Sequence, residues 1–160
     1  MLKPLSMAQV STKFFGSLQY GPEAEFHFPY GIPGFEHHRR YLFVEQPQTH
    51  PLVFVQSLED SGVCFLAVPA HAIAPDFRLE LSPEDKQALQ IKPGEPCRVG
   101  EDLLCLALVT LTEGADPTAN LRAPLVASLR TKRGLQSIQP ESVYSFRHPI
   151  ISSEGIAVCS

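Results

Sequence analysis

The sequence has no long hydrophobic run and only a small excess of one charge. No apolar stretch approaches the roughly 18 residues that a membrane-spanning helix needs. Residues 1–11 (MLKPLSMAQVS) also lack the apolar core of a secretory signal. We therefore expect a cytoplasmic protein with no membrane contact.

The formal net charge is only -4. A protein that binds the phosphates of nucleic acid usually presents a strongly basic face, so this slightly negative net charge argues against direct nucleic-acid binding. It is compatible with a basic protein partner, because complementary fields speed encounter. Basic residues do cluster at 39–40 and 130–133. We interpret the second cluster as an exposed hairpin turn, because Gly134 follows it.

The cysteines are few and are not arranged as C-x-x-C pairs. Cys64 and Cys105 lie in apolar runs, where an inert buried thiol is the usual interpretation. Cys97 and Cys159 lie in polar segments that we expect to be exposed. This usage fits a reducing compartment.

Catalytic and metal-binding motifs are also missing. The sequence contains no G-x-S-x-G, P-loop or G-x-G-x-x-G motif, and its six histidines show neither H-E-x-x-H nor H-x-H spacing. The acidic pairs Glu23/Glu25 and Glu80/Glu84 are best explained as solvated faces. The absence of a catalytic signature favours a binding role without a cofactor or metal; an enzyme that uses Cys97 or a histidine is an alternative.

What the sequence does contain is many short apolar segments between turns. The most prominent are 103–111 and 125–129, separated by a polar turn at 112–118. Their length and their content of Val, Thr and Leu favour two buried strands over one helix. Pro124 should open the second strand or lie at a sheet edge. Asn120 should cap a turn by bonding to its own backbone.

Other segments with strand character lie along most of the chain. They are 10–20 with a break at Gly16, 25–28, 41–44, 52–57, 63–68, 77–81 and 135–138. Residues 82–89 predict a helix that Ser82 caps, and 36–40 one helical turn. Together with fifteen prolines, this pattern predicts an all-β fold: a small closed or nearly closed β-barrel with one short helix.

The length of 160 residues suits a single domain. We place this domain at residues 10–150. Residues 1–9 would form a flexible leader, and residues 151–160 a C-terminal tail.

Several motifs, met in order along the chain, resemble the bacterial flagellar assembly factor FliW family. They are 12–16 (TKFFG), 26–36 (FHFPYGIPGFE), 54–58 (FVQSL), 87–91 (QALQI), 108–111 (LVTL), 118–126 (TANLRAPLV) and 147–149 (RHP). The match covers roughly residues 10–150. The GIPGF turn, the QS strand end and the TANLxAP segment in this order are together quite specific.

The resemblance implies a small β-barrel-like protein that is not an enzyme. Members of this family bind CsrA, an RNA-binding translational regulator, and relieve its repression of flagellin translation. They also bind flagellin itself, as a chaperone would. Free flagellin then occupies the FliW protein and leaves CsrA free to repress.

We expect the binding residues to lie in a groove between strands or along an exposed strand edge. The candidates are Gln56, Ser57, Leu104, Leu106, Asn120 and Arg122. For Leu106 and Asn120, core packing and turn capping are the stronger interpretation. Five other residues in the matching motifs are assigned to the fold: Gly31, Pro33, Gly34, Phe35 and Pro124.

Two segments depart from the family pattern. Residues 92–102 form a longer loop, richer in proline and glycine, and 69–74 (PAHAIA) replaces a more aromatic segment. Either change would alter partner affinity if the segment touches a partner. The alternative function is a barrel that binds a small ligand in an apolar interior. We expect phenylalanines to fill that interior instead: Phe14, Phe28, Phe54 and Phe65.

Overall fold

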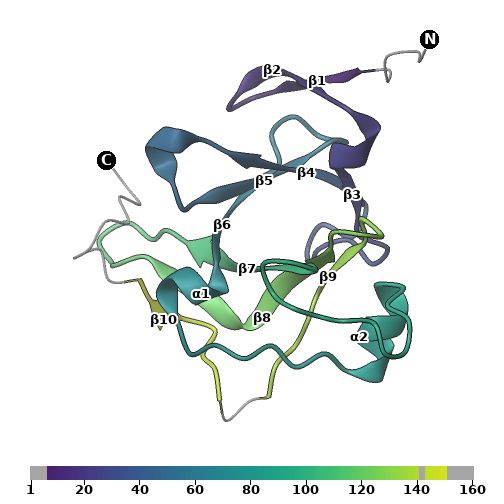
Figure 1. The fold of residues 1–160 in the computed structure, drawn as a ribbon. Helices are drawn as coiled ribbons and strands as arrows, with labels where there is room; N and C mark the ends of the chain where they lie inside the picture. Colours follow the sequence, from purple (N-terminus) through teal and green to yellow (C-terminus); the bar gives the residue numbers. More distant parts are fainter. Residues whose placement is uncertain (1–6, 141–142, 151–160) are drawn as a thin grey trace.

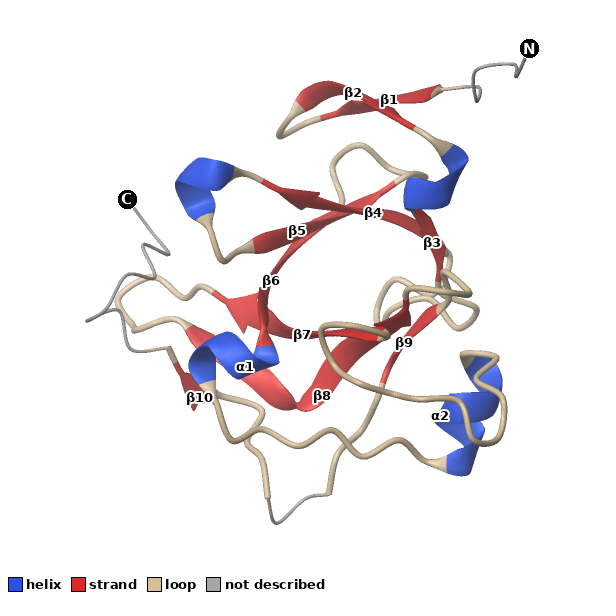
Figure 2. Ribbon diagram, viewed as in Figure 1, coloured by secondary structure: helices blue, strands red, loops and turns tan. Residues whose placement is uncertain are grey.

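The computed structural model describes residues 7–140 and 143–150. One large sheet curls into a barrel, a two-stranded hairpin stands above it, and two short helices lie outside it (Figures 1 and 2). The strands of these residues are β1 (Ala8–Thr12), β2 (Gly16–Tyr20), β3 (Glu25–His27), β4 (Arg40–Glu45), β5 (Val53–Ser57), β6 (Cys64–Pro69), β7 (Leu103–Thr110), β8 (Thr118–Ser128), β9 (Gly134–Gln136) and β10 (His148–Pro149). The helices are α1 (Ala70–Ile73) and α2 (Pro83–Ala88), with 3-10 turns at Pro22–Ala24 and Pro47–Thr49. Within the described residues, no helix is long and apolar enough to span a membrane.

The large sheet nearly closes on itself. Its strands pair in the order β10-β8-β7-β6-β5-β4-β3, with β9 also paired to β8, and each pair is antiparallel. At the seam, the His27 N–H in β3 donates to the Lys132 carbonyl in the β8–β9 turn over 2.8 Å. His27 also forms a parallel bridge with Arg133. The predicted all-β, nearly closed barrel is confirmed, and α1 is added to the one helix expected.

The predicted strand pair at 103–111 and 125–129 is present as β7 and β8, but β8 begins earlier, at Thr118. Leu106 pairs with Leu125 and Leu108 pairs with Asn120, so four residues of β8 (121–124) lie opposite one residue of β7. This bulge bends β8 sharply. Pro124 lies inside the strand at the bulge, and its predicted place at a strand start or sheet edge is wrong; a bulge tolerates proline because the ladder is interrupted there.

Asn120 stabilises the same bend. Its side-chain oxygen accepts hydrogen bonds from the backbone N–H groups of Arg122 (3.1 Å) and Ala123 (2.9 Å). These are the local side-chain-to-backbone bonds of an Asx turn. The predicted capping role of Asn120 is therefore confirmed.

Helix α2 also forms as predicted. The Ser82 hydroxyl accepts the Asp85 N–H at 3.1 Å, and Pro83 occupies the first helical turn, where its missing N–H costs nothing. The helical turn predicted at 36–40 is wrong. The backbone N–H groups of Arg39 and Arg40 donate to the Glu59 carboxylate across the barrel end, which draws this segment into an extended entry to β4.

Residues 77–81 are extended but pair with no strand, so the strand predicted there is wrong. Side chains occupy the positions of a neighbouring strand. The Tyr144 hydroxyl accepts the Arg78 N–H at 2.8 Å, and the Gln139 amide both accepts from the Glu80 N–H (2.8 Å) and donates to the Glu80 carbonyl (2.9 Å). The alternating sequence of residues 77–81 does give an extended backbone, but its hydrogen-bond partners are side chains distant in the sequence.

The barrel interior is filled by apolar side chains. Phe28 and Tyr41 are fully buried, with ring centroids 5.3 Å apart in an edge-to-face arrangement. Around them pack Phe26, Ile32, Val53, Val55, Ala67, Leu106, Leu125 and Ala127. Of the other phenylalanines expected inside, Phe54 and Phe65 are only partly buried. The expectation for Phe14 is wrong: it is 57% exposed, in the turn between β1 and β2.

Ala8 and Gln9, which the sequence places in a flexible leader, belong to β1. Residues 1–6, the predicted tail at 151–160 and Cys159 lie outside the described residues.

Candidate functional site

Three of the six predicted binding residues are buried in the barrel wall. Gln56, Ser57 and Leu106 are each at most 3% exposed. The Gln56 amide donates to the Ser57 carbonyl at 3.0 Å. The Ser57 hydroxyl accepts the N–H groups of Glu59 and Asp60 at 3.0 and 3.1 Å, and so holds the β5–β6 turn. These three side chains are therefore held within the barrel wall.

The other three lie at different places along β7 and β8. Leu104 is half-buried, packs against the barrel core and pairs with Ala127. Asn120 is committed to the bend of β8. Arg122 follows on that bend, with its guanidinium carbon 4.3 Å from the centroid of the Phe146 ring. The structure thus does not gather the six predicted residues into one site; of them, the half-buried Arg122 lies beside the exposed ring of Phe146.

Arg122 lies beside a segment that crosses the outside of the bend, which we call the strap (residues 137–140 and 143–147). It is part of the yellow-green to yellow chain at the lower edge of Figure 1. The strap is held by polar contacts: Gln139 and Tyr144 bind the backbone of 78–80, as above, and the Leu121 N–H donates to the Ser145 carbonyl at 3.0 Å. The Gln139 N–H donates to the Arg122 carbonyl as well.

We expect Gln139→Leu to lower the free energy of unfolding by about 2 kcal/mol, because it leaves the Glu80 N–H and carbonyl beside an apolar group of similar size. Gln139 is 2% exposed, so water cannot easily replace its amide. Urea denaturation measures the change. The matched control is Gln19→Leu, on an exposed position of β2, which should stay within about 0.5 kcal/mol. Equal effects for the two variants would contradict the strap's anchoring role.

The strap exposes three large apolar side chains within nine residues of chain. Ile138 is 78% exposed, Val143 59% and Phe146 53%. We call these three residues, with Arg122, the strap surface. Sequence reasoning missed the three. Their one local signal is a set of large apolar residues in a segment otherwise rich in Ser, Gln and Pro.

A hollow of about 340 Å³ adjoins the strap surface. Its lining includes Val143 of the strap, Leu121 of β8, and the rings of Phe77 and Tyr144, whose centroids are 4.5 Å apart. Asp76 and His148 also line it and contribute polar groups. This volume is at the lower end of the range of ligand pockets, about 300–1,000 Å³, and suits one or two side chains of a partner.

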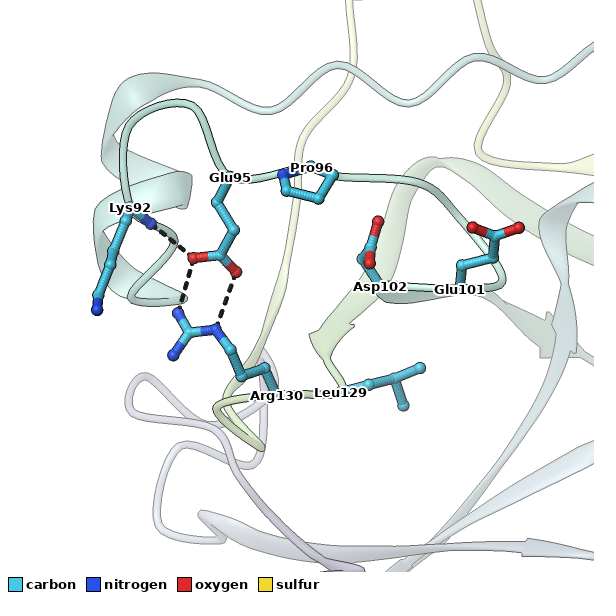
Figure 3. Close-up of a pocket in the computed structure, with 7 residues that line it drawn as sticks. All are labelled: Lys92, Glu95, Pro96, Glu101, Asp102, Leu129 and Arg130. Carbon is cyan, nitrogen blue, oxygen red and sulfur yellow. Dashed lines mark hydrogen bonds and ion pairs between the residues drawn. The ribbon is translucent and has the colours of Figure 1, made fainter.

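A second hollow, of about 470 Å³, separates the 92–102 loop from the β8–β9 turn (Figure 3). The Arg130 guanidinium donates hydrogen bonds to both carboxylate oxygens of Glu95, at 3.0 and 2.8 Å. This pair forms one side of the hollow. Asp102 and Glu101 stand on the opposite side of the hollow. Both carboxylates are paired with Arg98.

The basic cluster at 130–133 forms a turn, as predicted, and it also caps α2. Side chains of Arg133, Thr131 and Arg130 donate to the carbonyls of residues 88, 89 and 90, at 3.0, 2.8 and 2.8 Å. The last carbonyls of a helix have no partner within it, and cations near this end are favourable. These arginines are therefore engaged by the protein's own backbone, which removes much of a nucleic-acid patch.

The Arg130 side chain holds the pKa of Glu95 below its ordinary value, chiefly through their hydrogen bonds. We expect Arg130→Gln to raise the Glu95 pKa toward the ordinary glutamate value, about 4.3. Because the folded-state pKa is depressed, the pair stabilises the fold above the unfolded-state pKa and loses this effect as pH falls through the folded-state value. An NMR titration of the Glu95 carboxyl measures the shift. Arg98→Gln, which removes the partner of Asp102 instead, should leave Glu95 unchanged.

The cysteines give no support to a nucleophilic site. Burial raises the pKa of the Cys64 thiol to about 11 and that of Cys105 to about 12, so both are protonated at neutral pH, whereas the reactive form is the thiolate. Cys97 is half-buried, less exposed than its sequence suggested. In the part of the chain that the structure describes, no three His, Cys, Asp or Glu side chains are placed to hold a metal ion.

Comparison with known proteins gives a consistent result. A family model described as FliW protein matches residues 9–150. The flagellar assembly factor FliW of Alkaliphilus metalliredigens is 33% identical over 144 residues, covering 89% of this chain and 85% of the relative. That of Thermotoga maritima is 32% identical over 141 residues, covering 87% and 90%. A crystal structure of the flagellar assembly factor FliW superposes with a TM-score of 0.77 at 23% identity, covers 92% of this chain and 100% of that chain, and confirms the fold. The chain belongs to the FliW family.

Proposed function

We propose that this protein binds the translational regulator CsrA and thereby relieves repression of flagellin translation, and that it also binds flagellin as a chaperone-like partner. The observation that carries the proposal is the family match over residues 9–150, which spans the domain from β1 to β10. The relatives are named flagellar assembly factors, which supports the flagellar role. The protein acts by binding alone, in the cytoplasm, where translation takes place.

The surface of the molecule suits a protein partner. Exposed apolar side chains beside an arginine are typical of protein interfaces, where aromatic residues, Met and Arg are enriched. The strap surface has this composition. Of the six residues proposed from the sequence, we retain Arg122 for direct contact with a partner. The net charge of -4 suits a basic regulator, because attraction raises the rate of encounter.

Calorimetric titration of the folded protein with CsrA, and then with flagellin, both from the same organism, tests the proposal. We expect saturable binding of CsrA that flagellin abolishes, since partner exchange requires that the two complexes exclude each other. Binding of flagellin alone would leave the chaperone role and remove the translational one. If the protein binds neither CsrA nor flagellin, the proposal is overturned.

A further inference from the structure

We infer that the outer edge of β1 receives an extended, uncharged segment of a protein partner, which adds to the β1–β2 hairpin as a third strand. The inference rests on the proposed function and goes beyond it, because it names the edge, the binding mode and the chemistry of the segment. In this mode main-chain hydrogen bonds supply affinity, and the side chains beside them select the segment.

The first argument is that β1 is not enclosed in a larger sheet. β1 and β2 form a two-stranded sheet that stands apart from the curled one (Figure 1). Their residues pair in register from Ala8 with Tyr20 to Thr12 with Gly16, and within the described residues neither strand pairs with a third. In an antiparallel pair, about half of the N–H and C=O groups of each strand point away from its partner. Such an unpaired edge is a template for another strand.

The second argument is that β1 lacks the features that usually protect an edge. Charged side chains, above all lysine, and proline keep free edges from pairing. β1 (AQVST) contains neither, and Lys13 follows it only in the turn, where its ammonium lies 5.6 Å from the centroid of the Phe14 ring. β2 is also uncharged, but Pro22 and Glu23 follow it closely. We therefore assign the docking edge to β1.

The free edges of the large sheet are less suited to a partner strand. β10 has only two residues, and Pro149 has no N–H to donate. β3 has three residues, and its His27 N–H is already bonded to the Lys132 carbonyl at the seam. β1 offers five residues, which is about 17 Å of extended chain.

The third argument is that the hairpin is fastened to the barrel by its turn. The Lys13 N–H donates to the Ser61 carbonyl at 3.0 Å. The rings of Phe15 and Phe54 meet edge-to-face, with their centroids 5.1 Å apart. A template that is already ordered loses less entropy when a segment binds to it. The protein thus presents the β1 edge already formed.

The exposed face of the hairpin decides which segment fits. Gln9, Ser11, Ser17 and Gln19 are exposed, and the Gln9 amide donates to the Ser17 hydroxyl across the hairpin. These side chains are polar but uncharged, whereas Val10 between them is half-buried. A charged side chain on the added strand would lose water and find no opposite charge on either strand. We therefore expect uncharged polar residues opposite Gln9 and Ser11, and an apolar residue opposite Val10.

The test places a charge of either sign on β1 and compares it with the same change on β2. The edge variants are Gln9→Lys and Gln9→Glu, and the controls are Gln19→Lys and Gln19→Glu. The controls are closely matched, because Gln19 is also exposed and pairs directly with Gln9, yet lies one strand farther from the added segment. Each protein is titrated with CsrA and with flagellin of the same organism.

We expect both edge variants to weaken binding of at least one partner about fivefold or more, because either charge would lie beside an uncharged strand. Both controls should change the affinity less than about twofold. The losses should persist as NaCl rises from about 0.05 M to about 0.5 M, since they do not arise from attraction between charges. Circular dichroism confirms that each variant is folded.

Amide hydrogen exchange of the wild-type complex, measured by NMR, gives a readout that contact between side chains alone would not move. An added strand takes up the outward N–H groups of β1, so their exchange should slow about tenfold or more when the partner binds. The outward N–H groups of β2 should change much less, because they face away from the added strand.

Several outcomes overturn the inference, and they differ from failure of the proposed function. If a partner binds, but the β1 amides exchange as before or the edge variants bind as tightly as the wild type, the partner docks elsewhere. Tighter binding by Gln9→Lys would mean that the segment is acidic, and tighter binding by Gln9→Glu that it is basic. A wild-type dimer that Gln9→Lys converts to a monomer would mean that β1 pairs with a second copy of the chain. If the wild type binds neither partner, the proposed function fails, and this inference fails with it.

Discussion

Gly134→Ala is expected to lower the free energy of unfolding by about 3 kcal/mol, at the upper end of the usual cost of overpacking a core. A Cβ atom at residue 134 would lie 2.6 Å from Cζ of Phe28 and within 2.9 Å of both ring Cε atoms. Phe28 is fully buried among the side chains that fill the barrel, so its ring has no free space to enter. For a domain of this size, the loss corresponds to a fall in melting temperature of about 6–12 °C.

The position explains why the cost is high. Gly134 begins β9 directly after the turn whose Lys132 carbonyl accepts the His27 N–H and closes the barrel. Phe28 follows β3 on the other side of this seam. The two sides can approach closely because residue 134 has no side chain. A methyl group at this point would push the seam open as well as displace the ring.

A double variant separates the ring clash from other effects. Phe28→Leu removes the ring atoms that the new methyl group would meet, at its own cost of about 1–2 kcal/mol. If the clash is the cause, Phe28→Leu with Gly134→Ala should cost at least about 1 kcal/mol less than the sum of the two single changes. Gly62→Ala is the control, because its Cβ would meet only Asp60 Oδ1, at 3.5 Å, and should change stability by less than about 0.5 kcal/mol. Additive costs would show that the ring is not the obstacle.

Much of the barrel could be predicted from local sequence, because its strands follow the rules that local sequence encodes. β4, β5 and β6 are short runs of apolar and β-branched residues between turns, and each forms close to its predicted place. The cap of α2 and the Asx turn of Asn120 are also local, since each is made within three residues of chain. Predictions of this kind need no knowledge of the tertiary fold.

The errors arise where a distant group decides the outcome. Residues 77–81 have the alternation of a strand, but the bonds of their backbone go to side chains about 60 residues later in the chain. The carboxylate of Glu59 likewise overrides the helical turn expected at 36–40. Neither partner can be found by a window of sequence. The place of Pro124 likewise depends on a distant partner, because the bulge that accommodates it is set by the register between β8 and β7.

The six residues proposed for partner binding are scattered in the structure, although the motifs that suggested them are distinctive. Motifs that resemble the family drew attention to Gln56, Ser57 and Leu106, which are buried, because a recognisable motif is often one that the fold requires. The strap lies mostly outside the matching motifs, and its apolar residues look like ordinary loop residues in the sequence. Arg122 belongs to both, because it is in a matching motif and lies beside the strap. It lies in the TANLxAP motif and also projects from the bend toward Phe146.

Gly31→Ala is expected to have the larger effect of the two glycine changes in the GIPGF turn, about 3–5 kcal/mol in the free energy of unfolding. Gly31 has φ +66°, in the left-handed region where a side chain costs about 1–2 kcal/mol. A Cβ there would also lie 2.7 Å from Cα of Glu36 and 2.9 Å from its carbonyl oxygen. Those atoms are backbone and cannot rotate away. The turn would therefore have to open.

Gly34 offers a matched control within the same turn. Its φ is +89°, so alanine is strained there as well, but a Cβ would have no neighbour within 4 Å. Gly34→Ala should therefore cost only the conformational part, about 1–2 kcal/mol. The difference between the two variants, measured by urea denaturation, gives the cost of the steric contact with Glu36. A difference below about 0.5 kcal/mol would mean that the turn relaxes freely. We expect a larger difference, because the turn is held against the barrel: the Gly31 N–H donates a hydrogen bond to the carbonyl of the buried Phe28. Strain in the turn is then transmitted to the core.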